Sequence, residues 1–144
     1  MTSAFLTAER LDELRAVVGS HPDVAAAYLF GSLARGDADA ESDLDLAVIL
    51  RAGAGEGRLP QLASSLERFA PSGRVDVVVL GGQGAVFRHA ILREGIVVSD
   101  ADHDARVDFE ARTIVEFLDW KPTHDIAMAA VFDGLRERFA RGAA

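Results

Sequence analysis

Three short apolar segments limit this chain to folds built around a buried β-sheet. Val24–Phe30 contains no polar residue, and Asp43–Leu50 and Val75–Leu80 are apolar except for their aspartates. A strand without polar alternation is typical of a sheet that is covered on both faces. The segments are too short for core helices and are separated by glycine- and proline-containing turns, so we interpret them as strands.

Apolar residues at helical spacing separate these strands. The spacing predicts helices over roughly Ala8–Val18, Leu59–Phe69 and Ala85–Arg93, with a helical turn over Leu33–Gly36 and a short edge strand over Ile96–Val98. Thr7 is placed to cap the first of these helices. The sequence therefore predicts a small mixed sheet flanked by helices, in the α+β (α/β) class.

The last third of the chain is expected to form a pair of helices. From about Asp104, apolar residues recur every three or four positions, at Val107, Ala111, Ile114 and Leu118. Pro122 disfavours helical geometry in the residue before it, so we expect a break there and a final helix from about His124 to Arg141. That helix has Ala127, Val131, Leu135 and Phe139 in register. We predict one domain over 1–144, with a core over about 1–100 and C-terminal helices over about 104–141.

Composition excludes several classes of protein. The chain has 144 residues, which suits one domain, and its formal net charge of −8 disfavours direct binding to nucleic-acid backbones. It has no cysteine, which excludes disulfides, thiolate zinc sites and cysteine nucleophiles. No apolar run reaches the roughly 20 residues of a membrane span, and the N-terminus lacks a secretory signal. We therefore expect a cytoplasmic protein without membrane contact.

Carboxylates at alternate positions mark the start of the second apolar segment. Asp37, Asp39 and Glu41 are expected to lie in a solvated loop, but Asp43 and Asp45 begin a segment that is too apolar to be solvent-facing. Residues two apart on a strand share a face, so these two aspartates point the same way. Like charges so close repel unless a cation joins them, and Mg²⁺ or Mn²⁺ prefers such oxygen ligands.

Asp76 has the same anomaly in the third apolar segment. An unpaired buried charge there would cost several kcal/mol, so we expect Asp76 to complete a three-carboxylate metal cluster with Asp43 and Asp45 if the two strands pair. The alternative is an ion pair between Asp76 and an arginine such as Arg74. We favour the metal cluster because both strands show the same anomaly.

A glycine–serine turn follows the first strand. Gly31 allows a tight turn with close backbone approach, and Ser32 offers a hydroxyl and free backbone N–H groups, which together suit a phosphate. Arg35 is close enough in sequence to reach a phosphate oxygen. Such a turn is weak evidence by itself, but here ten residues separate it from Asp43-Leu44-Asp45.

This spacing resembles the signature of the polymerase-beta-like nucleotidyltransferase superfamily, with Asp76 similar to its third carboxylate. The resemblance implies that Gly31 and Ser32 hold a nucleoside triphosphate and that Asp43 and Asp45 bind two Mg²⁺ ions. It also implies that Asp76 binds one metal and helps to activate the acceptor hydroxyl. The implied reaction is in-line nucleotidyl transfer.

The whole chain resembles the minimal nucleotidyltransferases of the MntA-like antitoxin group. The likeness is carried by the two motifs above and by further segments: Val75–Leu80, Leu92–Gly95, Phe109–Thr113 and Phe117–Pro122. Such antitoxins are encoded beside a HEPN-domain RNase toxin and neutralise it by transferring AMP from ATP to a toxin tyrosine. The resemblance therefore implies a HEPN toxin and ATP as partners, in a hetero-oligomer with the toxin.

Two other functions stay open at this point. The chain could be an antitoxin that masks the toxin by binding alone, with its last amphipathic helices supplying the surface. It could also be a small-molecule nucleotidyltransferase of the aminoglycoside type, although its length hardly accommodates an acceptor pocket.

Overall fold

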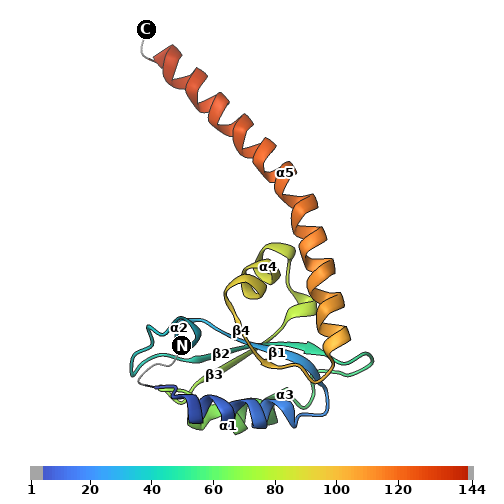
Figure 1. Cartoon of the computed structure of the whole chain (residues 1–144). Coiled ribbons are helices and arrows are strands. Elements are labelled where there is room, and N and C mark those ends of the chain that lie inside the picture. Colours follow the sequence, from blue (N-terminus) through green and yellow to red (C-terminus); the bar gives the residue numbers. More distant parts are fainter. Residues whose placement is uncertain (1–4, 143–144) are drawn as a thin grey trace.

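A four-stranded mixed sheet forms the centre of the molecule (Figure 1). The computed structural model describes residues 5–142, without the side chains of 122–129, 131–132 and 139–142. The strands lie in the order β3-β2-β1-β4. Their bounds are β1 Val24–Phe30, β2 Leu44–Leu50, β3 Val75–Val79 and β4 Ile96–Ser99. β1 is antiparallel to both β2 and β4, whereas β2 and β3 are parallel. The predicted mixed sheet is therefore confirmed.

Helices cover both faces of this sheet. They are α1 Ala8–Gly19, α2 Ser32–Arg35, α3 Leu59–Leu66, α4 Ala85–Glu94 and α5 His103–Gly142, with 3-10 turns at Glu67–Phe69 (η1) and Leu80–Gly82 (η2). Figure 1 shows α1 and α3 on one face and α4 with the beginning of α5 on the other. β1 is buried along almost its whole length, as its lack of polar alternation predicts.

The alternation of β2 decides where its aspartate lies. Leu44, Leu46 and Val48 join the core beneath α1 and α3, whereas Ala47 and Ile49 join the core beneath α4 and α5. Because side chains two apart share a face, Asp45 lies on the same face as Ala47 and Ile49. The strand thus places Asp45 on the α4 face of the sheet, at the end of its apolar core.

The expected helical pair is a single continuous helix, α5, and the predicted break at Pro122 is wrong. A proline inside a helix removes one hydrogen bond and crowds the preceding turn, at a cost of about 3 kcal/mol, but a helix can absorb this by bending. Figure 1 shows α5 changing direction partway along its length and extending well beyond the sheet. None of the helices in the described part of the chain has the length and apolar content needed to cross a bilayer.

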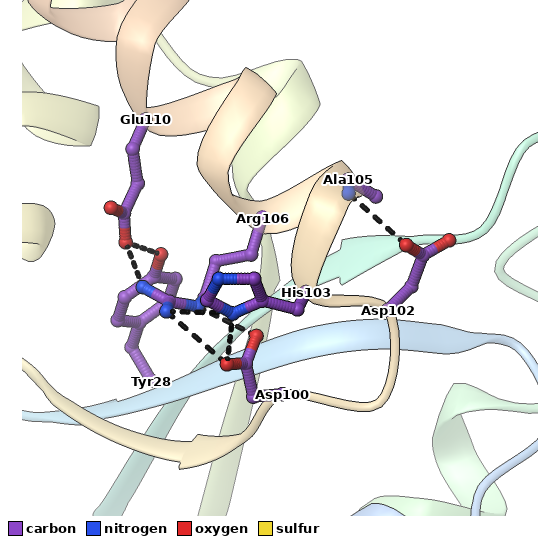
Figure 2. A network of polar contacts seen from close by, with 7 residues as sticks. All are labelled: Tyr28, Asp100, Asp102, His103, Ala105, Arg106 and Glu110. Atoms are coloured by element: carbon purple, nitrogen blue, oxygen red, sulfur yellow. Dashed lines mark hydrogen bonds and ion pairs between the residues drawn. The ribbon is translucent and has the colours of Figure 1, made fainter.

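A polar network ties the first turns of α5 to β1 (Figure 2). The Tyr28 hydroxyl donates to Glu110 Oε1 at 2.5 Å, and Arg106 Nη1 donates to the same oxygen at 2.7 Å. Burial and the neighbouring carboxylate raise the pKa of Tyr28, so its phenol stays protonated and keeps donating. The network fixes the angle at which α5 leaves the sheet.

Asp100 supplies the pH-sensitive part of this network. Hydrogen bonds from Arg106 and His103 lower the pKa of Asp100 from its ordinary value of 3.8 to about 2. A carboxyl whose pKa is depressed by folding stabilises the folded state above its unfolded pKa, and this contribution is lost as the pH falls through the folded pKa. Asp100 should therefore contribute to acid sensitivity between about pH 4 and pH 2.

We expect Asp100→Asn to flatten the pH dependence of stability in this window. Urea unfolding followed by circular dichroism at pH 6, 4 and 3 measures it, with Asp104→Asn on the exposed side of the same helix start as the control. The wild type and the control should lose more stability on acidification than Asp100→Asn does. Equal losses in all three proteins would contradict the assignment.

Candidate active site

Three carboxylates meet where β2 and β3 run side by side. Asp45 and Asp76 are direct partners in the parallel register, and Asp43 immediately precedes β2. The pKa of Asp45 is raised by its partial burial and by the negative charges of Asp76 and Asp43, in that order. The strand pairing on which the expected three-carboxylate cluster depends is present, and Asp45 is repelled by both Asp76 and Asp43.

Asp76 is exposed, and the expectation that it would be a buried charge is wrong. β3 is an edge strand, so the Asp76 side of that strand is open to solvent at its first residues. The charge of Asp76 therefore carries no cost of burial, and Asp76 is linked to the site by its register beside Asp45. Its predicted role as a metal ligand stays a prediction.

Asp43 is held by two residues that the sequence pattern did not assign to the site. Ser72 Oγ donates to Asp43 Oδ1 at 2.8 Å, and Arg74 Nε donates to the same oxygen at 2.9 Å. Arg74 thus pairs with Asp43 and not with Asp76, which was the alternative left open by the sequence. Both residues lie in the turn just before β3, and this position next to the strand of Asp76 is the sequence feature that could have indicated them. Both hydrogen bonds are made to the same oxygen of Asp43.

Gly31 lies against Asp45 because of the register of β1. Phe30 pairs with Asp45, so the chain turns into α2 directly beside that carboxylate. The backbone of Gly31 has φ +74°, and a Cβ placed there would overlap Asp45 Oδ2 and lie 3.2 Å from Asp45 Cγ. Both the conformation and the close approach require glycine. The predicted turn and the predicted carboxylate are therefore in direct contact.

A pocket of about 290 Å³ adjoins this turn, between the end of β1, α2 and α4. Phe30 and Phe87 meet edge to face in its wall, with ring centroids 6.0 Å apart. Gly31, Arg35 and Glu94 also line it. Arg35 is exposed, lies 3.3 Å from Asp37, and lowers the pKa of Asp45 by its positive charge, although burial and the other carboxylates outweigh it.

Ser32 opens α2 and is partly exposed. Of the three residues predicted to bind the nucleotide, Gly31 and Arg35 line the pocket. Ser32 follows Gly31 in the chain and is not among the residues that line the pocket. The structure thus brings Gly31, Arg35, Asp43, Asp45 and Asp76 to one corner of the sheet. Their roles, and that of Ser32, stay predictions.

The donor atoms of this corner suit a hard divalent cation. In the part of the chain that the structure describes, no group of three acidic or histidine side chains is already arranged around a single metal position. However, Mg²⁺ and Mn²⁺ prefer carboxylate oxygens, and the repulsion that raises the pKa of Asp45 would be relieved by a bound cation. The chemistry of these donor atoms therefore fits the predicted metal.

Solved structures with the same fold come from toxin–antitoxin systems. A chain of a toxin–antitoxin complex crystallised with AMP-PNP is 21% identical, with a TM-score of 0.64, over 84% of this chain and 96% of that one. A chain of the complex between the tri-AMPylated Shewanella oneidensis HEPN toxin and an MNT antitoxin is 21% identical, with a TM-score of 0.57, over 86% and 94%. At this identity the likeness shows the fold alone.

A minimal nucleotidyltransferase of solved structure is 34% identical, with a TM-score of 0.52, over 61% of this chain and 88% of that one. No protein with curated annotation matches the sequence significantly. The model of one protein family, described as polymerase beta, nucleotidyltransferase, matches residues 12–104. This match spans all four strands and the whole carboxylate corner, and it covers more than half of the chain. The chain belongs to the polymerase beta nucleotidyltransferase family.

Proposed function

We propose that this protein is an antitoxin that transfers AMP from ATP to a tyrosine of a cognate HEPN-domain RNase toxin and so neutralises it. The family supports nucleotidyl transfer, and the fold is shared with chains of toxin–antitoxin complexes, one of which holds a tri-AMPylated HEPN toxin. The observation that carries the proposal is the direct contact between Gly31 and Asp45, with Asp76 in register beside it. Since ATP is the donor, we place the reaction in the cytoplasm.

The pocket beside Gly31 suits the donor nucleotide. The edge-to-face pair of Phe30 and Phe87 offers an apolar wall for a base, and Arg35 offers a positive charge for a phosphate. In this arrangement the Gly31-Ser32 turn would hold the triphosphate, beside the carboxylate of Asp45, which would hold a metal ion. The absence of a Cβ at Gly31 keeps that space open.

Asp43, Asp45 and Asp76 would hold two Mg²⁺ ions, with Mn²⁺ as an alternative. When bound, the metal ions neutralise the charge that develops on the attacking and leaving oxygens. In the reaction, the tyrosine oxygen attacks the α-phosphorus and forms a new P–O bond. The bond from that phosphorus to the bridging oxygen breaks, and pyrophosphate leaves with the electron pair. We assign the acceptance of the hydroxyl proton to Asp76, and its exposure on the edge strand supports this role.

The open position of Asp76 favours a macromolecular acceptor. The pocket of about 290 Å³ beside Gly31 has room for a nucleobase, whereas Asp76 faces solvent on an edge strand that a partner protein can approach. A small antibiotic acceptor would have to be held at this same open edge. We therefore favour a protein tyrosine over an aminoglycoside-type acceptor.

Reconstitution with the HEPN protein encoded beside this one tests the proposal. The pair is incubated with Mg²⁺ and ATP labelled at the α-phosphate, and intact-mass and peptide analyses of the toxin follow. We expect label on a toxin tyrosine and a matching loss of RNase activity. Loss of RNase activity without label would show that binding alone masks the toxin, and transfer of AMP to an antibiotic in a parallel screen would favour a small-molecule acceptor.

A further inference from the structure

The two sides of α5 differ in how they are covered. On the side facing the domain, Phe109 and Thr113 are buried, and the ring of Phe117 stacks on His89 of α4 at 3.7 Å. On the outer side, Val107, Ile114 and Leu118 are 45%, 46% and 58% exposed. Ala111 is exposed between them. These four apolar side chains form a stripe that the domain itself leaves uncovered.

The spacing of this stripe continues to the end of α5. Steps of four, three and four residues join Val107, Ala111, Ile114 and Leu118, and the same alternation leads through Lys121 and Asp125 to Met128, Phe132, Leu135 and Phe139. Because α5 is one helix from His103 to Gly142, both apolar parts of the repeat lie on it, with Lys121 and Asp125 as the two polar positions between them. A seven-residue apolar repeat sustained over several heptads is typical of a coiled-coil seam.

The seam is symmetric about residue 123, which points to its partner. If a second copy of α5 lies antiparallel, position 107 faces 139, 111 faces 135, 114 faces 132 and 118 faces 128, so at these four pairs an apolar position faces an apolar position. The two polar positions then face each other, with Lys121 of each copy opposite Asp125 of the other. In a parallel pair, Lys121 would face Lys121 and Asp125 would face Asp125, which is repulsive.

We propose that two copies of this chain pair through α5 as an antiparallel coiled coil. A helix of 40 residues is about 60 Å long, which is enough to place the two domains at opposite ends of the seam. Figure 1 shows α2 on the side of the sheet away from the start of α5, so the pairing leaves the carboxylate corner of each copy accessible. The exposed stripe and the central charges are both accounted for by one partner.

The mass of the isolated protein is the first test. We expect the wild type at micromolar concentration to sediment as two chains and not as a single chain of 15.4 kDa. Leu118→Lys in the seam should weaken the pairing at least tenfold, whereas Asp119→Lys, one residue outside it, should not. A single-chain mass for the wild type, with a rise only on adding a HEPN protein, would overturn the proposal.

Cysteine cross-linking tests the antiparallel arrangement, since the chain has no cysteine of its own. Leu118→Cys and Met128→Cys proteins carrying different tags are mixed and oxidised. We expect a disulfide between the two different variants and little cross-linking of Leu118→Cys with itself. Cross-linking of Leu118→Cys mainly with itself would establish a parallel pair and contradict the proposed Lys121–Asp125 contacts.

Discussion

Asp45→Asn should abolish AMP transfer while leaving the protein folded. The substitution removes one anionic metal ligand and keeps the shape of the side chain, so transition-state stabilisation worth several kcal/mol is lost and the rate should fall about a thousandfold. Stability should not fall with it. Burial and the charges of Asp76 and Asp43 already raise the pKa of Asp45, so its ionised form is destabilised in the folded protein. Initial rates of label transfer and thermal unfolding measure the two effects.

Glu41→Gln is the matched control for this prediction. Glu41 is exposed in the acidic loop that precedes β2, so the variant loses the same charge a few residues away from the site. It should retain transfer at close to the wild-type rate. If Asp45→Asn and Glu41→Gln were equally active, or equally impaired, Asp45 would not be a metal ligand and the proposed mechanism would fail.

The position of Asp45 could be predicted from the sequence because two local rules determine it. Alternation along β2 places Asp45 on the same face as Ala47 and Ile49, and the ten residues between the glycine–serine turn and Asp43 link that turn to the aspartates. The sequence does not indicate which strand lies at the edge of a sheet, because strand order depends on long-range contacts. For this reason the exposure of Asp76 could not be predicted, and its place beside Asp45 was expected only on the condition that β2 and β3 pair, as they do.

Two other features were not predicted: the contact between Arg74 and Asp43, and the continuation of α5 through Pro122. The contact between Arg74 and Asp43 spans 31 residues and depends on how the turn before β3 meets the loop before β2, which no local pattern describes. At Pro122 the proline destabilises the helix, as expected, but the destabilisation is too small to end it. A helix can absorb this cost of about 3 kcal/mol by bending, and Figure 1 shows α5 changing direction partway along its length.

Gly31→Ala should impair both stability and transfer. The substitution forces an alanine into the left-handed region and drives its Cβ into the carboxylate of Asp45, so we expect a loss of at least about 3 kcal/mol in the free energy of unfolding. Gly53→Ala is the control, since Gly53 has φ +79° and an added Cβ there would meet no other atom within 4 Å. It should lose only the backbone cost of about 1 kcal/mol and keep its activity.

A double variant separates the clash from the backbone strain. Asp45→Ala removes Oδ2 and Cγ, the two atoms nearest to the added methyl group, and leaves its own Cβ at 3.4 Å. In that background Gly31→Ala should cost no more than Gly53→Ala does in the wild type, and the difference between its two costs is the energy of the contact between the turn and the carboxylate. Unfolding free energies of the four proteins in the cycle measure it. If Gly31→Ala costs the same in both backgrounds, Gly31 does not lie against Asp45, and the shared corner for phosphate and metal on which the proposed function depends does not exist.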